Sequence, residues 1–258
     1  MPLKLSILMF ALFLASGCTS QATAPYPATL PAADASAQMR DTRISATADQ
    51  KLAVYVLGGN WCHDSTDFAK LIEDPSVQPW LNDRFSIEMI NVGYLEHIRE
   101  YVEPYSVPII YATPTVMVVE PDTNTLLNRD SLSYWRSAST MTTADVRKYF
   151  EQFSSVIPPA NSYSPALNDA LARIDEFENQ QAERIYQAYA VLGPMIATLD
   201  AGEAAPDFEK HWVNLAKMRA AMGRDLAKLR ESAKRQDAQG VEKISLDFPT
   251  YARFIDAA

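Results

Sequence analysis

Residues 52–65 of the chain read LAVYVLGGNWCHDS, and this stretch decides the fold. Its first half, Leu52–Leu57, is a continuous apolar run, which is typical of a short strand buried on both faces of a sheet. The three residues that follow, GGN, favour a tight turn. From Cys62 onward, apolar residues recur at helical spacing until Asp74-Pro75 ends the pattern. The stretch therefore predicts a strand, a turn and a helix that begins at Cys62.

The next part of the chain continues this alternation of strands and helices. Three further strands and two further helices are expected: Phe85–Val92 (strand), Tyr94–Tyr101 (helix), Thr115–Glu120 and Thr125–Asn128 (a hairpin), and about Thr143–Phe153 (helix). Thr142 and Asp145 have the spacing of a capping box before the last helix. The predicted order is β-α-β-α-β-β-α, which is an α/β domain.

Two separated motifs resemble the thioredoxin superfamily. Trp61-Cys62-x-x-Ser65 is similar to the Trp-Cys-x-x-Cys active site of that family, which also follows a central strand, and Thr113-Pro114 resembles its cis-proline loop. The resemblance covers residues 41–155. It implies a thioredoxin-like sheet flanked by helices, a cis Pro114 that faces Cys62, and a substrate-binding role for Thr113, Pro114 and Trp61. From the residues alone, the alternatives are that Pro114 merely begins a strand compatible with a sheet edge and that Trp61 simply packs in the core.

The chemistry of the site follows from residues 62–65. A thiolate is the reactive form of cysteine, and the free N–H groups at a helix start stabilise negative charge on the Cys62 sulfur. Protonated His63 adds positive charge, whereas Asp64 opposes a thiolate. Ser65 lies within helical reach of the sulfur and is expected to donate a hydrogen bond to it. Cys62, His63, Asp64 and Ser65 are therefore the candidate catalytic residues.

The serine at position 65 limits the reaction. A second cysteine there would release a bound substrate, but Ser65 cannot, so a mixed disulfide on Cys62 has to be resolved by an external thiol. The sequence thus favours monothiol disulfide exchange, of the reductase or isomerase type, with protein thiols or disulfides as partners. Glutathione is a further candidate partner, although no sequence feature specifies a site for it. The alternative is a redox-inactive binding or scaffold lipoprotein that uses its helical tail to hold a partner.

The tail begins after Pro158-Pro159 and has no predicted strands. Residues 160–258 form a helical C-terminal region in which apolar residues recur every three or four positions over 165–199 and 207–233. Two antiparallel helices are therefore expected, with Gly193-Pro194 bending the first. The apolar stripes of this helical hairpin extension can cover each other, the α/β domain or a partner chain.

The N-terminus resembles an export signal. Residues 1–17 place an apolar run after Lys4, and Leu14–Cys18 is similar to a bacterial lipoprotein signal, in which the cysteine is lipidated. An ordinary cleaved signal peptide remains the alternative. Residues 18–40, rich in Ala, Pro, Thr and Ser, are expected to be a flexible tether. The expected location is the periplasm, with a lipid anchor in the outer rather than the inner membrane.

Composition excludes several classes of function. The 258 residues carry 32 acidic and 23 basic side chains, and this net charge of −9 disfavours nucleic acid. His97 and His211 do not have the spacing of metal ligands, so no metal and no cofactor is expected. Lipidation of Cys18 would leave Cys62 as the single free thiol, since the chain has only two cysteines.

Overall fold

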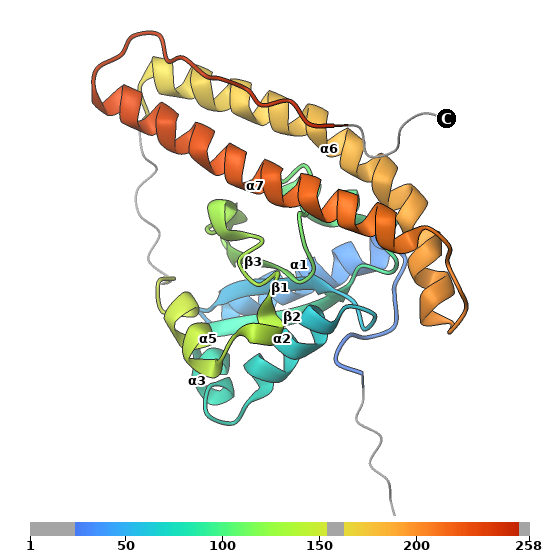
Figure 1. Ribbon diagram of the computed structural model, residues 1–258. Coiled ribbons are helices and arrows are strands. Elements are labelled where there is room, and N and C mark those ends of the chain that lie inside the picture. The colour runs from blue at the N-terminus through green and yellow to red at the C-terminus, as the bar shows by residue number, and fades with distance from the viewer. Residues whose placement is uncertain (1–23, 154–162, 253–258) are drawn as a thin grey trace, which may run out of the picture.

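A four-stranded mixed sheet lies at the centre of the fold. The computed structural model describes residues 24–153 and 163–252. The strands are β1 (Leu52–Gly58), β2 (Phe85–Asn91), β3 (Thr115–Glu120) and β4 (Thr125–Leu126), in the order β2-β1-β3-β4. β1 pairs in parallel with β2 and antiparallel with β3, and β3 pairs antiparallel with β4 (Figure 1). This topology confirms the predicted thioredoxin-like α/β fold.

Seven α-helices occur in the described residues: α1 (Ala32–Ala48), α2 (His63–Glu73), α3 (Gln78–Arg84), α4 (Ile98–Val102), α5 (Thr143–Phe150), α6 (Pro165–Asp200) and α7 (Phe208–Ala238). The predicted capping box is present at α5, where the Thr142 and Asp145 side chains each accept from the other residue's backbone N–H. α4 is shorter than the helix predicted from Tyr94, because the chain turns sharply at Gly93 and Leu95, which both have positive φ.

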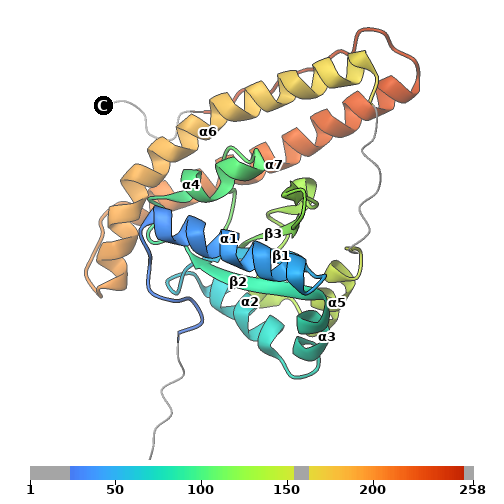
Figure 2. The same cartoon turned by 180° about the vertical axis from the view of Figure 1, so that it is seen from behind.

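The two faces of β1 contribute to two separate apolar cores. Leu52, Val54 and Val56 face a core that includes residues of α2, α3 and α5. Ala53, Tyr55 and Leu57 face the opposite core, to which α1, α4, α6 and α7 contribute (Figure 2). Every residue of β1 is buried. This is the pattern expected for a central strand, whose side chains point alternately to the two covered faces.

The N-terminal part of the described chain differs from the expected tether. Residues 32–40 belong to α1, and Ala35 and Met39 are buried in the core to which α4, α6 and α7 also contribute. Ahead of α1, the backbone of Tyr26 exchanges two hydrogen bonds with the side chain of Asn60, at 3.1 and 2.9 Å. The prediction failed here because the small alanine-rich face of α1 packs closely without a strong apolar period.

Two predictions fall outside the part of the chain that the structure describes. These are the export signal over residues 1–17 and the lipidation of Cys18. Within residues 24–153 and 163–252, no helix has both the length and the apolar character needed to cross a membrane.

The C-terminal region is the predicted helical hairpin, and it packs on the α/β domain. α6 and α7 contribute Ile185, Tyr189, Leu192, Leu215 and Met222 to the core that also holds Tyr55 and Leu57 of β1. Pro194 lies inside α6, and this helix bends toward its C-terminal end (Figure 1). After α7 the chain returns along α6, where the rings of Phe248 and Phe177 are 4.9 Å apart. Most residues of the apolar stripes are thus covered within the chain itself.

A buried carboxylate ties the hairpin to the α/β domain. Glu178 of α6 is fully buried and accepts from Arg129 of the domain at 2.8 Å and from Arg230 of α7 at 2.5 Å. The hydroxyl of Tyr111, in the loop before Pro114, donates to its other oxygen at 2.8 Å. The hairpin and the cis-proline loop therefore share one polar centre.

Candidate active site

The structure places Cys62 at the start of α2, as predicted. Cys62 is the N-cap residue, with extended backbone angles, and its carbonyl accepts the N–H of Thr66 at 3.1 Å to begin the helix. The turn before it is closed by a hydrogen bond from the Cys62 N–H to the carbonyl of Gly59. Its thiol is free and partly exposed. A nucleophile at this position is both accessible and close to the positive end of the helix dipole.

The loop before β3 faces this thiol. The Thr113–Pro114 peptide bond is cis, as the resemblance implies. The hydroxyl of Thr113 donates a hydrogen bond to the Cys62 sulfur at 3.2 Å, and the S–H donates to the Thr113 carbonyl at 3.4 Å. The two groups of one residue therefore fix the position of the sulfur.

Ser65 does not make the hydrogen bond that was expected of it. Its side chain is 0% exposed, and its hydroxyl has no hydrogen-bond partner among the described residues. It lies close to Gly58, at the end of β1, and to Tyr26. A Cβ added at Gly58 would come 2.6 Å from the Ser65 hydroxyl and 2.4 Å from the Tyr26 hydroxyl. Burial raises the pKa of this tyrosine well above its usual value. Ser65 occupies a closed, tightly packed position, and Thr113 binds the sulfur in its place.

His63 and Asp64 lie beside the thiol and interact with each other. His63 Nε2 is 3.2 Å from Asp64 Oδ2, and the backbone N–H of Ser139 donates to Asp64 Oδ1 at 3.0 Å. His63 is exposed, whereas Asp64 is half-buried. The carboxylate that opposes a thiolate is thus partly neutralised by an N–H group and, when protonated, by His63.

Trp61 both packs against the apolar core and lines the site. Its indole N–H donates to the carbonyl of Gly93 at 2.7 Å, which fixes the ring. The ring meets that of Trp212 of α7 edge to face, with centroids 6.3 Å apart and an angle of 85°. Trp61 is therefore both a residue that packs in the core and part of the wall of the site.

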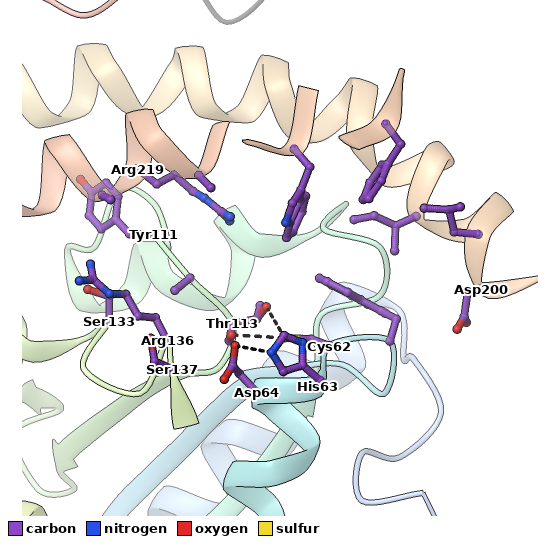
Figure 3. A pocket seen from close by; sticks show the side chains of 18 residues that line it. Cys62, His63, Asp64, Tyr111, Thr113, Ser133, Arg136, Ser137, Asp200 and Arg219 are labelled. Atoms are coloured by element: carbon purple, nitrogen blue, oxygen red, sulfur yellow. Dashed lines mark hydrogen bonds and ion pairs between the residues drawn. The ribbon is translucent and has the colours of Figure 1, made fainter. Parts of the chain in front are cut away.

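These side chains open into one cavity of about 590 Å³ between the α/β domain and the hairpin. Trp61, Cys62, His63, Asp64 and Thr113 line one side (Figure 3). Ser65 and Pro114 are absent from its lining. The opposite wall comes from α6 and α7 and includes Phe208, Trp212, Asp200 and Arg219. Five of the predicted site residues are thus brought together, but they form only part of the site.

Arg219 is the wall residue that sequence reasoning missed. It is only 8% exposed, its Nη1 is 3.3 Å from the Tyr189 hydroxyl, and its Nε has no hydrogen-bond partner. Its guanidinium lies over Trp212, 5.0 Å from the ring centroid. The sequence does carry a pattern that indicates a special role for Arg219. Trp212, Leu215, Arg219 and Met222 lie on one helix face, so a charged residue stands within an apolar stripe.

Tyr111 connects the cavity to the buried carboxylate of the hairpin. It lines the cavity, and its hydroxyl donates to Glu178. Burial, together with the nearby carboxylate, raises the pKa of Tyr111 well above its usual value of 10.0. This tyrosine therefore acts as a neutral hydrogen-bond donor that holds the cis-proline loop against α6.

The described residues contain no cluster of three or more His, Cys, Asp or Glu side chains that is able to hold a metal ion. What the cavity does offer is a nucleophilic sulfur that accepts a hydrogen bond from the Thr113 hydroxyl, aromatic walls and a buried cation. This set suits covalent sulfur chemistry on a molecule that enters from solvent.

The similarity of this chain to known proteins is limited. No protein-family model and no curated protein matches the chain. Among solved structures, a disulphide isomerase from Xylella fastidiosa Temecula1 aligns over 50% of this chain and 95% of its own, with 23% sequence identity and a TM-score of 0.45.

Proposed function

We propose that this chain catalyses monothiol thiol–disulfide exchange through Cys62. The observation that carries the proposal is the position of its sulfur, which lies at the start of α2, is held by both polar groups of Thr113 beside the cis Pro114, and opens into a cavity. Thr113 accepts from the thiol and donates to the sulfur, so both forms of Cys62 have a partner in the same place.

The reaction needs no other redox group. The Cys62 thiolate attacks one sulfur of a disulfide, a new S–S bond forms as the old one breaks, and the departing thiolate takes a proton from water. An external thiolate then attacks the substrate sulfur of the mixed disulfide and releases Cys62. One disulfide and one thiol are consumed and one of each is formed, so the number of electrons does not change. Protein or small-molecule thiols can serve as the external partner.

The alternative, a binding protein without turnover, loses one of its two supports. It relied on the serine at position 65 in place of a second cysteine, which stands, and on two apolar helix stripes left free for a partner. α6 and α7 bury most of these stripes against each other and against the sheet. The same helices supply one wall of the cavity at Cys62. A hairpin that completes the cavity around a nucleophile favours an active site over a scaffold.

The state of Cys62 in protein isolated without reductant tests the proposal. We expect mass spectrometry to find an adduct on Cys62 that a reductant removes, and we expect purified protein to accelerate exchange between a small disulfide and a small thiol. The Cys62→Ser variant should lose both properties. A Cys62 that is entirely a free thiol, together with equal exchange rates for the two proteins, would contradict the proposal.

We further propose that the chain is exported and lipidated at Cys18. The support is the layout of residues 1–17 and the segment Leu14–Cys18. Labelling of cells with a fatty acid is expected to mark the wild-type protein, and the Cys18→Ser variant should lose the label and leave the membrane fraction. Equal labelling of both proteins would exclude lipidation at this residue.

A further inference from the structure

We infer that the cavity beside Cys62 binds a small thiol or disulfide that carries a carboxylate, and that Arg219 binds this carboxylate. The inference rests on the exchange reaction proposed above and adds the class of substrate. It comes from the half of the site that the hairpin supplies (Figure 3).

The first observation is a buried cation without a counter-ion. Arg219 is 8% exposed, and no carboxylate of the described residues lies within ion-pair distance of it. Its contacts are the Tyr189 hydroxyl and the faces of Tyr189 and Trp212, while Nε has no partner. Arg230, also on α7, instead pairs with Glu178 and Asp175. Burying a charge is costly unless it is paired, so Arg219 is suited to an anion that arrives with the ligand.

The acidic side chains that line the cavity already have other partners. Asp64 accepts from the Ser139 N–H and lies beside His63, and Asp200 accepts from the Tyr94 hydroxyl at 2.7 Å. Neither carboxylate is within ion-pair distance of Arg219. A planar carboxylate from a ligand matches the guanidinium because the two groups form parallel hydrogen bonds.

The size and walls of the cavity indicate a small ligand. Its volume of about 590 Å³ falls within the range of pockets that enclose small molecules. Phe208 stacks on Trp212, with ring centroids 5.6 Å apart, and Trp212 meets Trp61. Flat aromatic surface therefore lines the cavity from the ring below Arg219 to the residue next to Cys62. An apolar or planar body, with a sulfur at one end and a carboxylate at the other, fits this arrangement.

Two aromatic disulfides that differ in charge provide the test. Dithiobis-nitrobenzoate carries a carboxylate on each ring and dithiodipyridine is uncharged, and both release a coloured thiol when Cys62 attacks. The rate of reaction through Cys62 is obtained by subtracting the rate of the Cys62→Ser chain. We expect Arg219→Met to slow the reaction with the carboxylate reagent about tenfold or more, the effect of losing a hydrogen bond to a charged group. Its reaction with dithiodipyridine should stay within about twofold of wild type.

A matched control and a measurement on the wild-type protein support this comparison. Arg224, on the same helix, is exposed and does not line the cavity, so Arg224→Met should leave both rates unchanged. In the wild-type protein, benzoate should slow the alkylation of Cys62 by iodoacetamide, whereas the uncharged benzamide should not. This second measurement does not depend on whether the Arg219 variant folds.

The outcomes separate the inference from the proposed function. If both reagents react normally, Arg219→Met affects them equally and benzoate gives no protection, the carboxylate site is wrong while exchange at Cys62 stands. If neither reagent reacts with Cys62 faster than with free cysteine, the exchange function fails. Preference for an acidic peptide disulfide over both small reagents would also overturn the inference, because it would make an extended chain the substrate.

Discussion

The hydroxyl of Thr113 lies 3.2 Å from the sulfur of Cys62, although 51 residues separate them in the chain. The carbonyl of the same threonine accepts the S–H at 3.4 Å. The carbonyl can interact favourably only with the thiol, whereas the hydroxyl can donate to a thiolate. The loop that is expected to bind substrate is therefore also the loop that holds the nucleophile.

Replacement of Thr113 by valine should make Cys62 less reactive. The change keeps the shape of the side chain but removes the donor to the sulfur, and a hydrogen bond to a charged group contributes about 1.5–3 kcal/mol. We expect the rate of Cys62 alkylation near neutral pH to fall about tenfold. Thr113→Ser keeps the hydroxyl and should react at nearly the wild-type rate. Equal rates for the valine variant and the wild type would show that this hydrogen bond does not support the thiolate.

Replacement of Ser65 by cysteine should convert the site from one thiol to two. Position 65 is fully buried one helical turn after Cys62, and the serine hydroxyl makes no hydrogen bond that would be lost. We expect oxidation of Ser65→Cys to form an internal disulfide, seen as the loss of two hydrogens by mass and of both free thiols. Ser65→Ala is the matched control and should leave the alkylation of Cys62 unchanged. A slower reaction in the alanine variant would restore the hydrogen-bonding role first expected of Ser65.

The sheet and the start of α2 were predictable because local pattern determines them. A continuous apolar run such as Leu52–Leu57 has no stable place except between two covered faces, and the turn residues after it leave few positions for the helix to start. The helix α1 escaped prediction for the opposite reason. Its buried residues Ala35 and Met39 carry little apolar signal, and its packing depends on contact with the sheet, which no local pattern contains.

The site was predictable only where it is local in sequence. Residues 61–64 and Thr113 belong to two short motifs, and the fold brings them together at the cavity. Arg219 and Trp212 come from the distant hairpin, and their place in the wall depends on how α7 packs on the domain. A periodic pattern shows that a helix face is buried, but it does not show what the face is buried against.

The Glu178 centre should be worth far more to stability than a surface ion pair. Removal of one partner from a buried charge cluster costs about 3–5 kcal/mol, because the remaining charges stay desolvated. Arg129 retains some access to water, so the lower end of this range is expected for Glu178→Ala in urea unfolding. Glu183→Ala breaks an exposed pair with Arg99 and should cost less than about 1 kcal/mol. Equal losses would mean that the cluster does not join the hairpin to the domain.

Glu88 should make stability fall as the pH rises. Burial raises its pKa above the usual value of 4.5, and hydrogen bonds from Thr42 and Gln38 only partly oppose this shift. The native chain therefore binds the proton more tightly than the unfolded chain, and stability is lost as the pH rises from 4.5 through the raised pKa. Glu88→Gln should thus be more stable than wild type near neutral pH, and the gain should disappear below pH 4.5. Urea unfolding at several pH values checks this, and a pH-independent difference would contradict it.

Two glycines in the hairpin should respond to alanine with opposite signs. A Cβ at Gly193 of α6 would lie 2.4 Å from the carbonyl oxygen of Tyr94, whereas one at Gly223 of α7 would meet nothing within 4 Å. Alanine is favoured over glycine inside a helix by about 1 kcal/mol, so Gly223→Ala should raise the free energy of unfolding by up to that amount.

Gly193→Ala should instead lower the free energy of unfolding by about 1–3 kcal/mol, because a backbone oxygen cannot move aside as a flexible side chain can. The following turns of α6 carry cavity-lining residues such as Asp200, so a displaced α6 should also expose Cys62. We therefore expect faster alkylation of Cys62 in Gly193→Ala and an unchanged rate in Gly223→Ala, both measured under conditions where the variants are folded. If Gly193→Ala were as stabilising as Gly223→Ala, the close contact of α6 with the Tyr94 backbone would not exist in solution. The hairpin would then have no fixed position over the thiol.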